Sequence, residues 1–278
     1  MNKLAQFTRR KNLVIGAIVT VVMIIMAIFA PLIAPYDPIY DADLMVAEEP
    51  PSSSYIFGTD DQGRDIFSRV VYGARISLSV GLISQLMNSM IGITLGLIAG
   101  YFGKWIDDLI MGLTNIMLSI PSIIFALAIM ALLGPGLINV FIALGFTNWS
   151  YTCRITRSQA LYTKNLNYVN ASRALSYGEV NIMFTQILPN IVGPILVIAT
   201  LGISGAILIE ASLSFLGLGT QPPTPSWGGM LATAREQLFT APWISIFPGM
   251  FIFLTVLGLN LFGDGLRDLL DPHTSQRK

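Results

Sequence analysis

Charged side chains are scarce in this chain. Of its 278 residues, 12% are Asp, Glu, Lys or Arg and 53% are hydrophobic, whereas about 25% of the residues in a soluble domain are charged. The charges are clustered, and long uncharged runs separate the clusters. Because a charge at the centre of a bilayer costs a few kcal/mol or more, this distribution indicates a chain that crosses a membrane several times. The net charge of zero gives no sign of a nucleic-acid partner.

Cysteine and histidine each occur once, as Cys153 and His273. A single cysteine cannot form an internal disulfide, and we interpret Cys153 as a small packing residue. His273 lies in a polar tail without a set of neighbouring ligands, so we expect no metal site. The sequence also lacks a phosphate-binding loop ending in Gly-Lys-Ser/Thr and any Ser-His-Asp set within the membrane. We therefore expect no catalytic residues, and no ATP hydrolysis by this chain itself.

Six apolar runs are predicted to be membrane-spanning helices, each of which needs about 20 residues. They lie at about 13–34, between 75 and 104, and at about 109–132, 137–150, 191–216 and 243–262. The first is longer than the apolar core of a signal peptide, which has roughly 7–15 residues. Pro31 and Pro35 also occupy the place where cleavage would occur, so we interpret this run as an uncleaved anchor.

The third and fourth runs share one stretch without any charge, between Asp108 and Arg154. A single helix of that length would be about twice as long as a membrane is thick. The helix-breaking triplet Gly134-Pro135-Gly136 therefore predicts a tight hairpin at this point. We expect Pro121 to kink the first helix of the hairpin.

Three glycines in the second run, Gly92, Gly96 and Gly100, are spaced by four residues. They share one helix face and leave it without side-chain bulk, so another backbone can approach closely. This spacing predicts helix packing and carries no information about a substrate.

Lysine and arginine set the orientation of a membrane protein, because they are enriched in cytoplasmic segments. The N-terminal tail contains Lys3, Arg9, Arg10 and Lys11 and no acid, which places it in the cytoplasm. Six crossings then divide the chain into a cytoplasmic tail with the first helix (1–36), an external segment (37–74), a transmembrane unit (75–264) with a cytoplasmic loop (153–190), and a cytoplasmic C-terminal tail (265–278). The external segment is rich in acids, namely Asp37, Asp41, Asp43, Glu48, Glu49, Asp60, Asp61 and Asp65.

The cytoplasmic loop is predicted to contain two short helices. Ala171, Ala174 and Leu175 lie at helical spacing, and we expect Gly178 to end this first helix. A second helix would begin at Glu179, carry the apolar residues Ile182, Met183, Phe184 and Ile187, and be broken by Pro189 before the fifth span. Such a pair either forms a knob for a partner protein or lies on the membrane surface, and periodicity alone does not decide between these alternatives.

Residues 168–190 resemble the coupling loop, or EAA motif, of ABC importer permeases. In this register Asn170-Ala171-Ser172 stands for Glu-Ala-Ala, Ser176 for the glycine of the motif, and Leu188-Pro189 for its end. Three further segments, 57–78, 210–228 and 263–272, are similar to signatures of peptide and nickel importer permeases. The resemblance covers nearly the whole chain and points to the dipeptide and oligopeptide "C" permease type.

The resemblance implies an all-α polytopic membrane protein with six transmembrane helices and the type I ABC importer permease fold. It also implies a location in the bacterial inner membrane, a second related permease subunit, two cytoplasmic ATPase subunits that hold ATP and magnesium, and an external substrate-binding protein. This chain would bind no cofactor. We expect import of dipeptides or oligopeptides. Import of nickel or a metal chelate is the alternative, and a stand-alone channel or secondary carrier is favoured less.

Two groups of candidate site residues follow from these motifs. The ATPase-contacting group is Ala171, Arg173, Ala174, Leu175, Ser176, Gly178 and Glu179. Glu210 is a candidate for contact with a substrate amine, although we favour a helix–helix hydrogen bond. Arg64 and Asp65 are candidates for an outer gate, although we favour a surface ion pair in an interfacial helix. We expect Asp264 and Asp268 to end the last span and to pair with Arg267.

Overall fold

The computed structural model describes residues 11–270, which form helices and no β-strand. His273 and the tail residues Lys3, Arg9 and Arg10 lie outside this range. The helices are α2 (Lys11–Ile28), α3 (Ala30–Ile33), α4 (Ile66–Phe102), α5 (Lys104–Ser119), α6 (Ser122–Leu133), α7 (Leu137–Gly145), α8 (Trp149–Thr163), α9 (Asn167–Ala174), α10 (Glu179–Ile182), α11 (Leu188–Phe215), α12 (Trp227–Thr233) and α13 (Trp243–Leu270).

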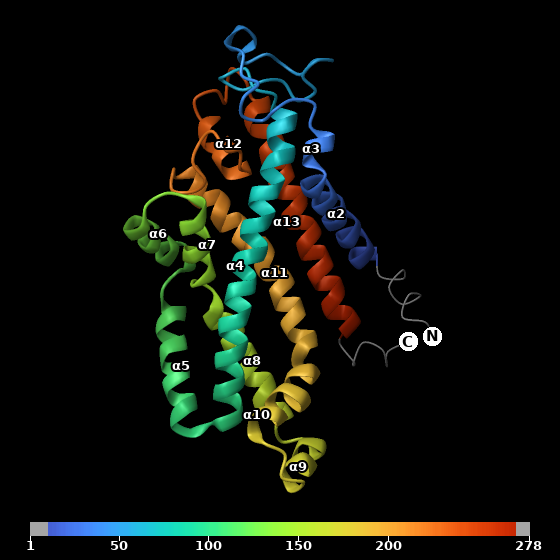
Figure 1. Cartoon of the computed structure of the whole chain (residues 1–278), viewed down its shortest axis with the longest axis vertical. Helices are drawn as coiled ribbons and strands as arrows, with labels where there is room; N and C mark the ends of the chain where they lie inside the picture. Colours follow the sequence, from blue (N-terminus) through green and yellow to red (C-terminus); the bar gives the residue numbers. More distant parts are fainter. Residues whose placement is uncertain (1–10, 271–278) are drawn as a thin grey trace.

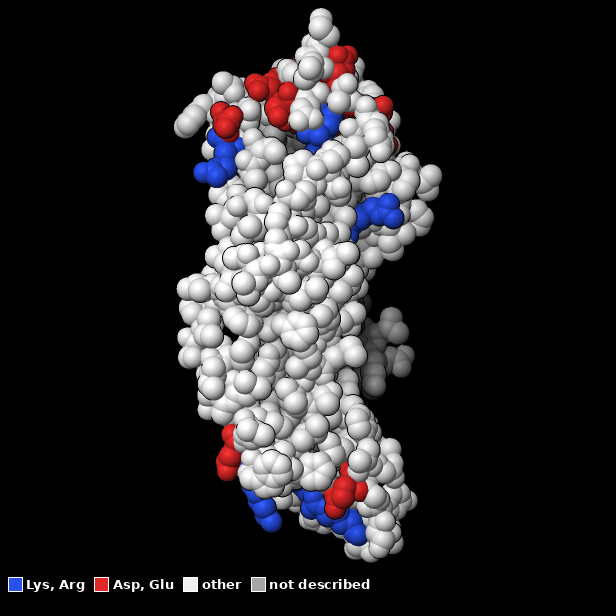
Figure 2. Space-filling model, turned by 60° about the vertical axis from the view of Figure 1, so that its left-hand side comes forward, with Lys and Arg blue, Asp and Glu red and all other residues white. Residues whose placement is uncertain are grey.

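The long helices α4, α11 and α13 run along the longest axis of the molecule (Figure 1). α4 packs against α8 and α11, and α13 packs against α11 and α2. The segment between α3 and α4 lies at one end together with α12, and α9 and α10 lie at the other end. Charged side chains gather at these two ends, and a broad band between them is white in Figure 2. This band is the part of the surface that a bilayer can cover without burying charge.

Six crossings were expected, and four helical segments are long and apolar enough to cross a membrane on their own: Lys11–Ile28, Ile66–Phe102, Glu179–Phe215 and Trp243–Leu270. A fifth crossing is possible if α5 and α6 are counted as one broken span. The prediction of a single helix at 137–150 is wrong, because α7 ends at Gly145 and α8 begins at Trp149. α7 and then α8 pack along α4 (Figure 1). The composition of α8 is too polar for the helix to be recognised as a membrane span.

The chain bends by 88° between α5 and α6. The expected kink at Pro121 is therefore a complete break, since α5 ends at Ser119 and Ile120 has an extended backbone. Proline forces this outcome by lacking an N–H group and by excluding the helical conformation from the residue before it. The expected turn between α6 and α7 is present, with positive φ angles at Gly134 and Gly136.

Two helices extend into the segments that were expected outside the transmembrane unit. α4 begins at Ile66, eight residues before the expected end of the external segment, because the Asp65 carboxylate accepts a hydrogen bond of 2.7 Å from the Ser68 N–H and caps the helix. α13 continues to Leu270, so the expected C-terminal tail begins inside a helix. The structure records no ion pair between Arg267 and either Asp264 or Asp268 in the described range.

Pro189 was expected to separate the second short helix from the fifth span, and this expectation is also wrong. Helical structure is continuous from Glu179 to Phe215. A π-helical turn, Met183–Ile187, comes directly before the proline, and the Leu188 N–H bonds to the Met183 carbonyl five residues earlier. The wider turn accommodates the ring and the missing N–H of Pro189 without ending the helix.

Candidate functional site

The segment from α9 to α10 projects beyond the ends of α4 and α8 (Figure 1). Residues 173–181 are all exposed in the described chain. Large apolar side chains protrude here: Leu175 is 73% exposed and Val180 is 64% exposed, and Tyr177 and Phe184 are about half exposed. Large apolar side chains at the tip of a charged end, outside the charge-free band, are suited to a protein partner.

A tight turn ends α9 and gives this projection its shape. Ser176 has a φ of 60°, its N–H bonds to the Arg173 carbonyl at 2.9 Å, and the Tyr177 N–H bonds to the Ser172 carbonyl at 3.1 Å. This pair of bonds is the Schellman arrangement, in which a left-handed residue satisfies the last carbonyl groups of a helix. The expectation that Gly178 ends α9 is wrong, because Gly178 has a φ of −62° and precedes α10 instead. The left-handed residue is Ser176, at the position where the EAA motif has glycine.

The opposite face of the projection is buried. Ile182, Met183 and Ile187 pack with Val169 of α9 and Leu97 of α4 in one hydrophobic cluster. Of the four apolar residues expected on the second short helix, Phe184 alone is exposed. The projection therefore has an inner face fixed to the helical body and an outer face that is open.

Tyr101, near the C-terminal end of α4, holds the projection from both sides. Its hydroxyl donates to the Glu179 carboxylate, and the Arg173 guanidinium lies 5.2 Å from the centre of its ring, within the range of a cation–π contact. Lys164 donates to the Gly100 carbonyl at 2.7 Å, a favourable place for a cation at a helix C-terminus. Partial burial lowers the pKa of Lys164, and the charge of Arg173 acts in the same direction.

α8 connects the projection to the body and packs closely on α4. A Cβ atom added to Gly92, Gly96 or Gly100 would lie 2.6–2.8 Å from atoms of α8, so these three glycines permit the contact. The Arg157 guanidinium forms a two-bond ion pair with Asp107 of α5. Residues 153–163 of the expected loop therefore belong to the helix α8. Cys153, on α8, is fully buried.

Glu210 is fully buried in α11 and reaches another helix. One carboxylate oxygen accepts from Ser77 of α4 at 3.3 Å and the other from Ser214 at 2.7 Å. This is the helix–helix hydrogen bond that the sequence favoured for Glu210. No solvent reaches the carboxylate in this conformation.

Arg64 and Asp65 do not form the surface ion pair that was favoured. Both residues are buried. Arg64 bonds to Asp60 through Nε at 2.8 Å, and Asp65 caps α4. Asp60 also pairs with Arg69 at 3.3 Å. Arg69 was not singled out from the sequence, although it lies within the 57–78 signature.

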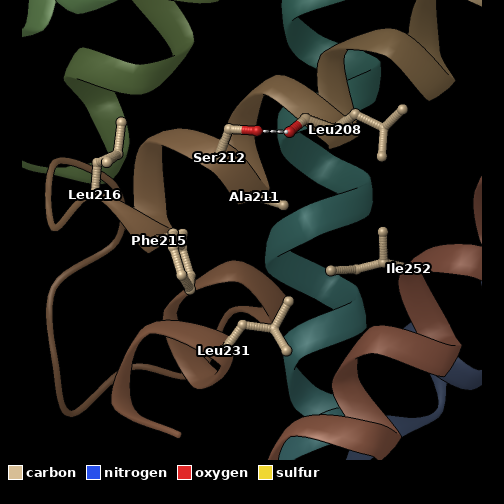
Figure 3. Close-up of a pocket in the computed structure, with 7 residues that line it drawn as sticks. All are labelled: Leu208, Ala211, Ser212, Phe215, Leu216, Leu231 and Ile252. Atoms are coloured by element: carbon tan, nitrogen blue, oxygen red, sulfur yellow. Dashed lines mark hydrogen bonds between the residues drawn. The ribbon is translucent and has the colours of Figure 1, made fainter. Parts of the chain in front are cut away.

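An apolar groove on α11, α12 and α13 was also missed (Figure 3). It has a volume of about 410 Å³ and is lined by Leu208, Ala211, Ser212, Phe215, Leu216, Leu231 and Ile252. Its one hydroxyl group, on Ser212, donates to the Leu208 carbonyl at 2.8 Å. The groove offers no charged group for recognising a charged ligand. Within residues 11–270 no cluster of His, Cys, Asp and Glu could hold a metal ion.

Comparison with known proteins gives two matches to family models. Residues 92–276 match the binding-protein-dependent transport system inner membrane component, and residues 3–51 match the N-terminal TM domain of oligopeptide transport permease C. The dipeptide transport system permease protein of Alkalihalophilus pseudofirmus is 46% identical over 96% of this chain and 88% of its own length.

Two further relatives have similar coverage. The oligopeptide transport system permease protein of Bacillus subtilis is 42% identical over 96% of this chain and 87% of its own length. The glutathione transport system permease protein of Pectobacterium atrosepticum is also 42% identical, over 96% of this chain and 89% of its own length. All three relatives are named as permease proteins of bacterial transport systems.

Proposed function

The chain belongs to the family of binding-protein-dependent transport system inner membrane components, and we propose that it is the permease subunit of an ATP-driven importer of dipeptides or oligopeptides. The observation that carries this function is likeness over nearly the full length to permeases named for dipeptides, oligopeptides and glutathione. These names favour a peptide over nickel or a metal chelate as the substrate. A permease of this family works with ATPase subunits and a substrate-binding protein, so the chain is a transport subunit and ATP is hydrolysed on its partners.

The finer arrangement is part of the proposal. The chain pairs with a second, related permease in the inner membrane of a bacterium, and two ATPase subunits bind on the cytoplasmic side. Both termini and the α9–α10 projection face the cytoplasm, and the acid-rich segment before α4 faces outward. The excess of lysine and arginine near the N-terminus supports this orientation.

The α9–α10 projection is the proposed ATPase-docking site. Ala171 and Ala174 of α9 and the following residue, Leu175, are exposed, and we place them in a groove of one ATPase subunit. Arg173 and Glu179 hold the projection on Tyr101, and Ser176 and Gly178 shape the turn between the two short helices. Because α8 packs closely on α4, closure of the ATPase pair would move these helices together and switch the pore between inward-facing and outward-facing states.

The docking proposal is tested by replacing Ala174 and Leu175 together with Asp. Both side chains are exposed, so the variant should insert and fold, while two charges would enter the apolar contact with the ATPase. Association with the ATPase subunits and ATP-dependent peptide uptake should both be abolished, as measured by co-purification and by uptake into vesicles.

A matched control adds the same charge at the start of α9. Asn165→Asp with Asn167→Asp places two carboxylates on exposed positions away from the tip. This variant should retain uptake. Normal uptake by the Ala174→Asp, Leu175→Asp variant would rule out docking at this site, and equal loss in both variants would show that charge at this end, rather than the apolar contact, causes the defect.

A further inference from the structure

α5 lies at the edge of the molecule, where it packs on α4 and α8 (Figure 1). Its exposed surface is divided into two stripes, each at helical spacing. The apolar stripe consists of Trp105, Leu109 and Ile116, which are 70%, 66% and 62% exposed. The polar stripe consists of the exposed residues Asp108, Gly112, Asn115 and Ser119. Lipid suits the first stripe, and a membrane-spanning helix directs a stripe of the second kind away from lipid.

The polar stripe continues onto α8 through one hydrogen bond. The Arg154 guanidinium donates to the side-chain oxygen of Asn115 at 2.7 Å, and both residues are exposed. Asn115 lies seven residues after Asp108, which is about 10 Å further along the helix. It belongs to the pair α5 and α6, which together are apolar enough to form one broken membrane span. Arg154 therefore carries its charge at membrane depth.

The charge of Arg154 has no acid to balance it directly. Within residues 11–270 the structure records no ion pair of Arg154. Arg157, one turn further along α8, takes the carboxylate of Asp107. Asp108 lies two helical turns from Asn115, and Asn115 itself is neutral. An exposed arginine at this depth is stable where it meets water, and such residues mark the paths of substrates and ions.

The break between α5 and α6 is an independent observation on the same face. Ser119, Ile120 and Pro121 are exposed, and Ile120 has an extended backbone. Ser119 lies about 16 Å along the helix from Asp108, near the middle of a hydrocarbon core about 30 Å thick. Non-helical backbone at this depth is tolerated only where it is buried in protein or lines a water-filled cavity. This chain does not bury the break, so the end of the polar stripe also requires water or another subunit.

We propose that the polar stripe of α5, together with Arg154 and Ser158 of α8, lines the water-filled path of the transported peptide. Ser158 is exposed one turn after Arg154. The amide and hydroxyl groups of this lining match the donors and acceptors of a peptide backbone. Arg154 and Asp108 offer one charge of each sign, as the two ends of a free peptide do. The inference rests on the proposed function, because it takes the chain to be a peptide permease.

Cysteine labelling compares the two stripes at the same depth. In a Cys153→Ala background, Asn115→Cys and Ile116→Cys place a thiol on neighbouring residues of α5 that belong to different stripes. The complete importer in nanodiscs, without nucleotide, is treated with a trimethylammonium methanethiosulfonate, whose charge keeps it in water. Because lipid excludes a charged reagent, Asn115→Cys should react at least about tenfold faster than Ile116→Cys.

Two results of this labelling would overturn the inference. Equal rates, or a faster reaction at Ile116→Cys, would show that the polar stripe is not the hydrated face of α5. Ser119→Cys is labelled in parallel, at the break. If neither Asn115→Cys nor Ser119→Cys reacted, another subunit would cover the stripe, and the path would lie elsewhere.

A transport measurement separates this inference from the proposed function. Asn115→Trp would narrow the path, so uptake of the dipeptide Ala-Ala into vesicles should be lost while the ATPase subunits remain bound. Ile116→Trp is the matched control, since it adds bulk on the lipid side and should retain uptake. Normal uptake by Asn115→Trp, or equal loss in both variants, would refute the path and leave the proposed function standing. Faster labelling of Asn115→Cys would still support a water-filled path if the importer did not carry Ala-Ala.

Discussion

The contact between α4 and α8 can be tested by adding a single methyl group. A Cβ on Gly96 would lie 2.6 Å from the Cys153 carbonyl oxygen and 2.7 Å from Cβ of Thr156. Since ordinary contacts begin near 3.4 Å, Gly96→Ala would push the helices apart by about 0.8 Å. Overpacking of this kind costs about 1–3 kcal/mol, and the better helix propensity of alanine returns about 0.5–1 kcal/mol. The net loss should be about 1–2 kcal/mol.

Gly112→Ala on α5 is the matched control. No atom lies within 4 Å of a Cβ added at Gly112, so alanine should stabilise the helix by about 0.5–1 kcal/mol. The two variants should therefore differ by about 2 kcal/mol in thermal unfolding of the purified complex, with Gly96→Ala the less stable. Equal stability of the two variants would refute the close packing of α8 on α4, and with it the rigid connection between the projection and the body.

Three other outcomes are expected at the α9–α10 projection. Ser176→Gly should stabilise the left-handed turn by about 1 kcal/mol and retain uptake, whereas Ser176→Val should destabilise the turn and reduce uptake, as measured by hydrogen exchange across residues 168–182 and by vesicle transport. Tyr101→Phe removes the bond to Glu179 and keeps the ring beneath Arg173, so amide exchange in α10 should accelerate while α9 changes less. In a Cys153→Ala background, Ser176→Cys should be labelled by an impermeant maleimide from the cytoplasmic side only, and labelling from the outside would reverse the proposed orientation.

Hydropathy and helix breakers predict the class of the fold and most of its long helices, because lipid requires long uncharged runs. The start of α4 was missed because Arg64 and Arg69 suggest an exposed segment. Arg64 is buried against Asp60, four residues earlier, and Arg69 is buried against Asp60 and the carbonyl of Pro38, 31 residues earlier. α8 was read as a loop from Cys153 onward because its composition is polar, and its packing depends on a partner surface on α4 that the sequence shows only as spaced glycines.

The α9–α10 projection illustrates the same division. The register with the EAA motif places Ser176 at the glycine position, and the structure has its left-handed residue there. The expectation that Gly178 ends α9 relied on residue type alone. Which face of the projection is open could not be read from periodicity, because Ile182 and Phe184 are equally apolar and only the packing against Leu97 separates them.

The central claim is that this permease receives the ATPase at the tip of α9. The most direct measurement places a photoreactive side chain at Leu175 in the assembled importer and, as a control, at Met45, which is 90% exposed at the opposite end. Illumination should cross-link Leu175 to an ATPase subunit and should give no such product at Met45. Cross-linking of the ATPase at Met45, or its absence at Leu175 in an importer that still transports peptide, would contradict the account.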